Sequence, residues 1–251
     1  MGNKEVKDYR YYLDAAIKAV ENEGYKIIFM ALHGSQNYGL ATENSDYDWY
    51  AAVEPTFYNF VFDEPLASKD IEYAYGIITV KDVRGMFQMI KKASFNFLEI
   101  LFTDYYFINE KYREEWNTLR MLGRKISKSN PYATIRSYIG VAGNTLQKEM
   151  TGKKCAQILT FANQITSYID GDDFNDVLTS EKIFNREFIM KIKTEEYTTG
   201  YLNILAQAQF NYLHNYGTNY LRDKNAAKMM DINTRDAINS ILIDICRKKS
   251  W

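Results

Sequence analysis

Residues 33–53 read HGSQNYGLATENSDYDWYAAV, and this segment decides both the fold and the chemistry that the sequence predicts. It begins with the pair Gly34-Ser35 and continues to two aspartates, Asp46 and Asp48, on a short apolar run. Side chains alternate between the two faces of a strand, so we expect the two carboxylates to point the same way. Paired carboxylates suit Mg²⁺, and a Gly-Ser turn lets backbone N–H groups approach a phosphate closely. The segment therefore predicts a phosphate-binding turn beside a divalent-metal site.

Apolar runs predict strands on both sides of this turn. Residues 25–32 (YKIIFMAL) end at the Gly-Ser pair, as a buried strand would, and residues 46–53 are apolar on both faces except at the aspartates. Residues 70–80 (DIEYAYGIITV) read as a third strand. Three strands with helices between them indicate a mixed α/β unit.

Helical spacing dominates the rest of the chain. Apolar residues recur at helical intervals over residues 4–22, a Thr79–Asp82 capping box predicts a helix over about 81–92, and Ser94 opens another through residue 102. Six later segments are also expected to be helical: 110–125, 131–150, 154–169, 180–193, 195–216 and 234–248. We therefore expect an α/β domain, a mixed sheet with flanking helices, over residues 1–125, and an all-helical domain over residues 126–251.

The composition is that of a globular protein without a strong overall charge. Hydrophobic residues make up 46% of the 251 residues, and the net charge is −1, so any polyanion has to meet a local patch. Two cysteines are too few for a disulfide framework, and the N-terminus lacks an apolar signal region, so we expect a cytoplasmic protein. No run of 18 apolar residues occurs, so no membrane span is expected.

A third carboxylate is available on the third predicted strand. Asp70 and Glu72 are two residues apart and share one face of that strand. We favour Glu72, because it lies inside the apolar run, and Asp70 stays open as the alternative. Glu99, in a Leu-Glu-x-Leu segment, is interpreted as a structural residue that makes an ion pair, and His33 as a packing residue beside the turn.

Cations for phosphate binding are expected from the helical part. Lys153 and Lys154 follow Gly152 at the start of a predicted helix, where the helix N-terminus and an ammonium group would both act on a triphosphate. Arg136, on the preceding predicted helix, is a further candidate.

These residues resemble a known family. Gly34-Ser35, a spacer and Asp46-x-Asp48 are similar to the signature of the DNA polymerase beta-like nucleotidyltransferase superfamily. The fuller pattern, Gly-Ser-x-x-Tyr-Gly-Leu-x-Thr-x-x-Ser-Asp-x-Asp, resembles small predicted nucleotidyltransferases of bacteria and phages. Residues 92–102 resemble that branch again, with Ser94-Phe95 where it has Asn-Pro. The branch also has a His and an Arg after its helical lysine, and residues 155–161 supply neither.

The resemblance implies a nucleotidyltransferase-like N-terminal domain that moves an NMP from an NTP to a hydroxyl acceptor, on RNA or protein, and releases pyrophosphate. Mg²⁺, or Mn²⁺ in its place, would be the cofactor, held by Asp46, Asp48 and Glu72 or Asp70. The phosphates would contact Gly34, Ser35, Lys153, Lys154 and Arg136. Because the basic set after Lys154 is reduced, two alternatives stay open: a catalytically degenerate nucleotide- or RNA-binding module, and an antitoxin-like transferase that modifies a protein.

Overall fold

The computed structural model describes residues 9–64, 66–226 and 228–248. Its sheet has five strands in the order β3-β4-β2-β1-β5. β1 (Ile27–His33) pairs antiparallel with β2 (Asp48–Val53) and with β5 (Tyr106–Ile108), and β2 pairs parallel with β4 (Gly76–Asp82). β3 (Lys69–Tyr73) pairs antiparallel with β4 at the sheet edge. The sheet is therefore mixed, as predicted.

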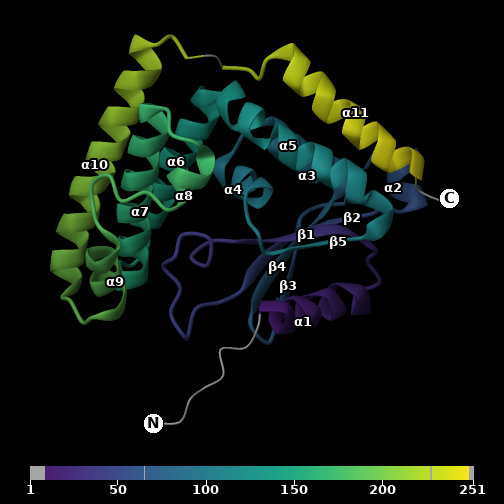
Figure 1. Ribbon diagram of the computed structural model, residues 1–251. Helices are drawn as coiled ribbons and strands as arrows, with labels where there is room; N and C mark the ends of the chain where they lie inside the picture. Colours follow the sequence, from purple (N-terminus) through teal and green to yellow (C-terminus); the bar gives the residue numbers. More distant parts are fainter. Residues whose placement is uncertain (1–8, 65, 227, 249–251) are drawn as a thin grey trace.

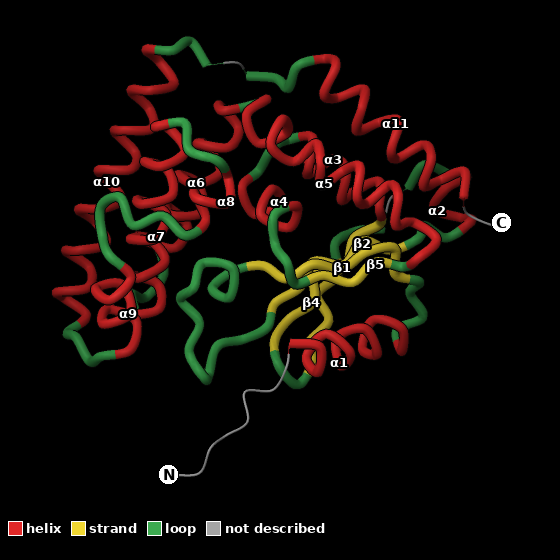
Figure 2. Tube along the Cα trace, in the orientation of Figure 1, coloured by secondary structure: helices red, strands yellow, loops and turns green. Residues whose placement is uncertain are grey.

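Helices cover both faces of the sheet (Figures 1 and 2). α1 (Tyr9–Asn22) packs its buried Leu13, Ala16 and Val20 on one face, against side chains that include Trp49 and Val80. The other face is covered by α3 (Val83–Lys91), α4 (Phe95–Leu98), η1 (Glu99–Leu101), α5 (Arg113–Ser129) and α11 (Ile232–Lys248). A short helix, α2 (Phe57–Val61), follows β2, and η2 (Glu110–Tyr112) precedes α5.

The remaining helices form a bundle beside the sheet (Figure 1). They are α6 (Pro131–Leu146), α7 (Gly152–Asp170), α8 (Phe174–Leu178), α9 (Arg186–Thr194) and α10 (Thr199–Asp223). One hydrophobic cluster continues from the sheet into this bundle, because Phe95 of α4 stacks on Tyr138 of α6 and contacts Phe161 of α7. The helical C-terminal part agrees with the prediction. The domain boundary placed after residue 125 falls inside α5 and stays a prediction.

Several predicted elements differ from the structure. The single strand predicted over residues 70–80 is a hairpin of β3 and β4, in which Tyr73 pairs with Gly76 across a tight turn. β2 begins at Asp48, so Asp46 lies in the preceding loop rather than on the strand. α3 is capped by Asp82, which accepts from the Arg84 N–H, so the predicted Thr79 capping box was wrong.

The helix predicted over residues 180–193 begins only at Arg186. The buried side chain of Asn163 explains this, because it bonds the backbone of Ser180, Ile183 and Phe184 and so holds that segment in a loop. The short elements α2, α8 and β5 were not predicted, and residues 4–8 of the first predicted helix lie outside the described residues. Within the described ranges, no helix has the length and apolar character that crossing a bilayer requires.

Candidate functional site

Two neighbouring strands bring the sequence motif together. β1 ends at His33, β2 begins at Asp48, and these two residues are paired across the antiparallel ladder. The connecting loop therefore leaves and returns at the same end of the sheet. Gly34 (φ +87°) and Gly39 (φ +67°) adopt the left-handed conformation that glycine tolerates best, and residues 34–39 form a tight turn, hereafter the 34–39 turn.

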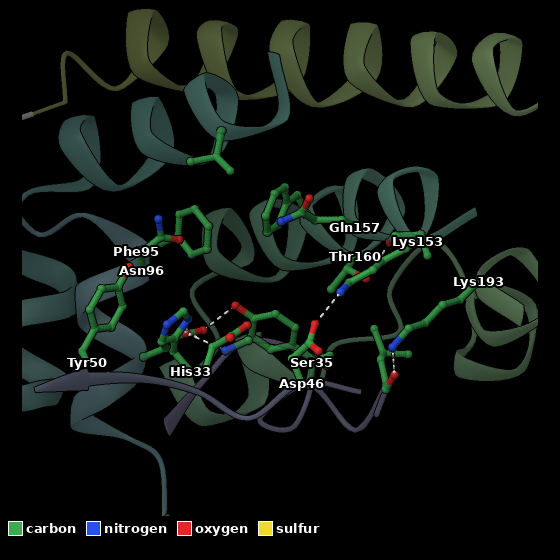
Figure 3. Close-up of a pocket in the computed structure, with 18 residues that line it drawn as sticks. His33, Ser35, Asp46, Tyr50, Phe95, Asn96, Lys153, Gln157, Thr160 and Lys193 are labelled. Carbon is green, nitrogen blue, oxygen red and sulfur yellow. Dashed lines mark hydrogen bonds and ion pairs between the residues drawn. The ribbon is translucent and has the colours of Figure 1, made fainter. Parts of the chain in front are cut away.

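A cavity of about 280 Å³ lies between this loop and the helical bundle. Ser35, Asp46, Lys153 and Lys193 lie at one end in Figure 3, and Tyr50 and Asn96 at the other. Its lining also includes His33, Gly34, Tyr38, Leu40, Asp48, Phe95, Glu99, Val141, Ala156, Gln157, Thr160 and Phe161. Asp46 and the lysines thus gather toward one end of the cavity, and the rings of Tyr50, Phe95 and His33 toward the other.

The two aspartates of the motif both line the cavity. The Asp46 side chain is 52% exposed, and its Oδ2 lies 3.0 Å from Nζ of Lys153. Asp48 is half-buried, and its Oδ1 accepts a 3.0 Å hydrogen bond from the Ile77 N–H. Burial raises the pKa of the Asp48 carboxyl, the Ile77 N–H opposes that shift, and nearby Asp46 adds to it. The two carboxylates are therefore close enough for their charges to repel each other.

Asp70 and Glu72 lie farther from the motif. They share the sheet face of Asp48, because Ile71 between them points into the opposite cluster under α1. Glu72 is paired with Ile77, whose N–H bonds Asp48, while Asp70 accepts a 2.7 Å bond from the Thr79 hydroxyl. β4 separates both acids from β2, and neither lines the cavity. In the part of the chain that the structure describes, no group of three His, Cys, Asp or Glu is placed to hold a metal ion.

The predicted cations separate into one that reaches the cavity and two that do not. Lys153, in the first turn of α7, lines it. Lys154 turns away and donates to the Glu149 carbonyl at 2.6 Å, and Arg136 is exposed on α6 outside the lining. A second cation, Lys193 at the end of α9, was not predicted.

Lys193 connects the loop before β2 to the helical bundle through hydrogen bonds. Its ammonium group donates to the Leu40 carbonyl and to the Ser45 hydroxyl. Burial and the charge of Lys153 lower the pKa of Lys193, and Asp46 opposes that shift. In the sequence Lys193 is one of several lysines on a short amphipathic helix, and nothing local distinguishes it.

Glu99 and His33, which the sequence led us to interpret as structural residues, also line the cavity. Glu99 is 1% exposed and accepts the Gly34 N–H at 2.9 Å and the Tyr38 hydroxyl. Its hydrogen-bond partners are therefore the turn residues rather than a lysine or arginine. The His33 ring stacks on Tyr50 with centroids 4.2 Å apart, which agrees with a packing role.

These contacts decide which groups of the turn face a ligand. The Gly34 N–H is directed to Glu99 and so is not available to a phosphate. The Ser35 hydroxyl lines the cavity, and among the described residues no hydrogen bond engages it. Of the Gly-Ser pair, Ser35 therefore offers an unengaged polar group to the cavity, whereas the Gly34 N–H is already bonded.

Gly76 lies close to the backbone of Tyr47 and to the Asp48 side chain, and its replacement by alanine is expected to destabilise the protein. A Cβ there would lie 2.7 Å from the Tyr47 carbonyl oxygen and 2.9 Å from Asp48 Oδ1. The Tyr47 oxygen belongs to the backbone and cannot retreat without moving the chain, and Gly76 has a φ of +154°, which alanine rarely adopts. We therefore expect a loss of about 1–3 kcal/mol in the free energy of unfolding. Gly140→Ala is the matched control, since nothing lies within 4 Å of its Cβ position in α6 and alanine there should be stabilising. Urea denaturation measures both, and equal effects of the two variants would contradict the close approach at Gly76.

A mixed sheet that brings a Gly-Ser turn to an Asp-x-Asp pair is typical of nucleotidyltransferases related to DNA polymerase beta. The family model described as RlaP, the RNA repair pathway DNA polymerase beta family, matches residues 11–161, more than half of the 251 residues, and the chain belongs to this family. Membership implies a nucleotidyltransferase with nucleotide substrates, and polymerase beta families typically use divalent metals. The match includes Asp46, Asp48 and Lys153, while Lys193 lies beyond it. A search of the curated proteins found no match to the chain.

Proposed function

We propose that the protein transfers an NMP from an NTP to a hydroxyl group of RNA and releases pyrophosphate. The observation that carries this proposal is the gathering of Asp46, Asp48 and Ser35 with Lys153 and Lys193 around one cavity. Carboxylates for a metal, a small hydroxyl and two ammonium groups are the groups that a metal-bound triphosphate needs. RNA is favoured over a protein acceptor because the description of the matched family names an RNA repair pathway.

The residues present suit Mg²⁺, or Mn²⁺ in its place. Asp46 is half-exposed and pairs with Lys153, and Asp48 uses one oxygen for the Ile77 N–H. Both carboxylates therefore keep oxygen atoms that can bind an ion, and Mg²⁺ and Mn²⁺ both prefer such hard oxygen ligands. Asp46 and Asp48 would hold the ion, which would supply charge neutralisation for the phosphates and acidify the acceptor hydroxyl.

The protein's own groups position the substrate. Lys153 and Lys193 approach from α7 and α9 to bind phosphate oxygens, Lys193 with the N–H that its bonds to Leu40 and Ser45 leave over, and Ser35 donates from the turn. Tyr50, Phe95 and Phe161 form an apolar wall that holds the rest of the nucleotide and excludes water. Phosphoryl transfer needs positioning and charge neutralisation more than covalent chemistry from the protein, and the cavity offers both.

We keep Glu72 as the proposed third carboxylate and Asp70 as its alternative. Two strand spacings place β3 about 10 Å from β2, and the longer, more flexible glutamate side chain has the greater reach across that gap. Glu72 is also in register with Ile77, beside Asp48, whereas Asp70 is already bonded to Thr79. If Glu72 is the third acid, Glu72→Gln should lose most of the transfer activity that Asp70→Asn retains.

The function is tested by incubating the protein with each α-³²P-labelled NTP, with Mg²⁺ or Mn²⁺, and with RNA that ends in a free 3′ hydroxyl. We expect metal-dependent transfer of label to the RNA, and none to the same RNA with a 3′ phosphate, because the phosphate blocks the attacking oxygen. Label on an added protein mixture instead would support the protein-modifying alternative. Nucleotide binding without transfer to either acceptor would support the binding module.

A further inference from the structure

We propose that Glu99 is the positioning residue of the 34–39 turn and holds it so that Ser35 faces the cavity. This inference rests on the proposed function in one respect: the nucleotide is the ligand that the turn would bind. Glu99 has no part in the transfer chemistry outlined above. It lies in η1, directly after α4, and acts through its contacts with Gly34 and Tyr38.

The contacts bracket Ser35 on both sides. Glu99 Oε1 accepts the Gly34 N–H at 2.9 Å, one residue before Ser35, and Oε2 accepts the Tyr38 hydroxyl, three residues after it. Gly34 has a φ of +87°, so its backbone has conformational freedom that an external bond must remove. Glu99 supplies that bond from a buried, rigid position, since its neighbours Leu98 and Ile100 are fully buried.

The groups facing Glu99 make a mainly uncharged cluster, in which Glu99 and Tyr138 are buried and the other members are half-buried. The facing groups are His33 from β1, Tyr38 from the turn, Tyr50 from β2 and Tyr138 from α6. Burial raises the pKa of Glu99 to about 8 and lowers the pKa of His33 to about 4, so both are mainly uncharged near pH 7. The Tyr138 hydroxyl is buried and has no hydrogen-bond partner among the described residues. Burying a hydroxyl without a hydrogen-bond partner costs free energy, and apolar side chains would fill the same space without that cost. Packing alone therefore does not explain this polar cluster.

The first test measures the turn directly, without activity. Hydrogen exchange of the Gly34 amide, followed by NMR, should be at least about tenfold faster in Glu99→Ala, the effect of one lost buried hydrogen bond. Glu99→Gln keeps an oxygen for Gly34 and should restore protection. Glu54→Gln is the matched control, because Glu54 also accepts a tyrosine hydroxyl, from Tyr112 at 2.7 Å, away from the cavity. Equal Gly34 protection in Glu99→Ala and the wild type would overturn the proposal.

The second test links the turn to the nucleotide. Calorimetry should show that Glu99→Ala weakens the binding of Mg²⁺–NTP by about tenfold, whereas Glu99→Gln and Glu54→Gln bind like the wild type. A purely structural role would instead lower stability and leave nucleotide affinity unchanged, which would overturn the proposal. If the wild type binds no nucleotide, the proposed function fails, and the Gly34 exchange measurement still decides whether Glu99 holds the turn.

The pH dependence of stability provides the third readout. The folded Glu99 retains its proton to about pH 8, whereas the unfolded one loses it near 4.5, the ordinary pKa of a glutamate. The folded state therefore binds more protons, and the folding equilibrium constant falls as pH rises through this range, by up to about tenfold per unit. His33 opposes this only below 6.5, the ordinary pKa of a histidine. Between pH 6.5 and 8, Glu99→Gln should remove the fall, and an unchanged slope would contradict the buried, protonated state.

Discussion

Replacing Asp48 with asparagine is expected to reduce nucleotidyl transfer by about 10²–10³-fold or more while leaving the protein folded. Such a loss is typical when one preorganised electrostatic group is removed from an active site. Asparagine keeps an oxygen for the Ile77 N–H and removes a charge that burial already disfavours. The free energy of unfolding should therefore change by less than about 1 kcal/mol.

The measurement is the rate of label transfer, with circular dichroism melting of each variant. Asp63→Asn serves as the control, because its carboxylate is 97% exposed and pairs with Arg84 far from the cavity lining. Asp63 also has a φ of +51°, which asparagine tolerates. Transfer by Asp48→Asn within tenfold of the wild type, at an equal melting temperature, would exclude Asp48 as a metal ligand.

Removing both cavity lysines is expected to weaken the binding of every NTP by about 10²–10³-fold. Each charge-assisted hydrogen bond contributes about 1.5–3 kcal/mol at a sheltered site, and the exposed Lys153 lies at the lower end of that range. The Lys153→Ala, Lys193→Ala double variant should affect ATP, GTP, CTP and UTP alike, because ammonium groups bind phosphates and do not distinguish bases.

Lys154→Ala is the control that the structure supplies. It removes the same charge one residue along α7, but its ammonium group donates to the Glu149 carbonyl, away from the cavity. A thermal-shift series with each NTP and Mg²⁺, followed by calorimetry, separates the variants. If Lys154→Ala weakens binding as much as the double variant, phosphate binding depends on overall charge and not on the geometry of the cavity.

Sequence reasoning was most successful where the relevant residues are close in the chain. The first two strands and the turn between them follow from two apolar runs and a Gly-Ser pair. It failed at residues 69–82, where an uninterrupted β-type pattern hides a hairpin, because the turn at Ala74 and Tyr75 has none of the usual Asn-Gly or Asp-Gly chemistry. Because of this hairpin, the two candidate third acids lie on the edge strand β3, and β4 separates them from Asp48 on β2.

The sequence by itself determined that Ser35, Asp46 and Asp48 meet, because consecutive antiparallel strands bring the end of one to the start of the next. Only the tertiary structure decided which other groups join them. Lys153 reaches Asp46 across 107 residues, Lys193 reaches Leu40 across 153, and Glu99 reaches Gly34 across 65. Helical periodicity shows which residues share a face of α7 or α9, but not which face meets the sheet. That choice depends on how the helices pack against the shared hydrophobic cluster, which no local pattern contains.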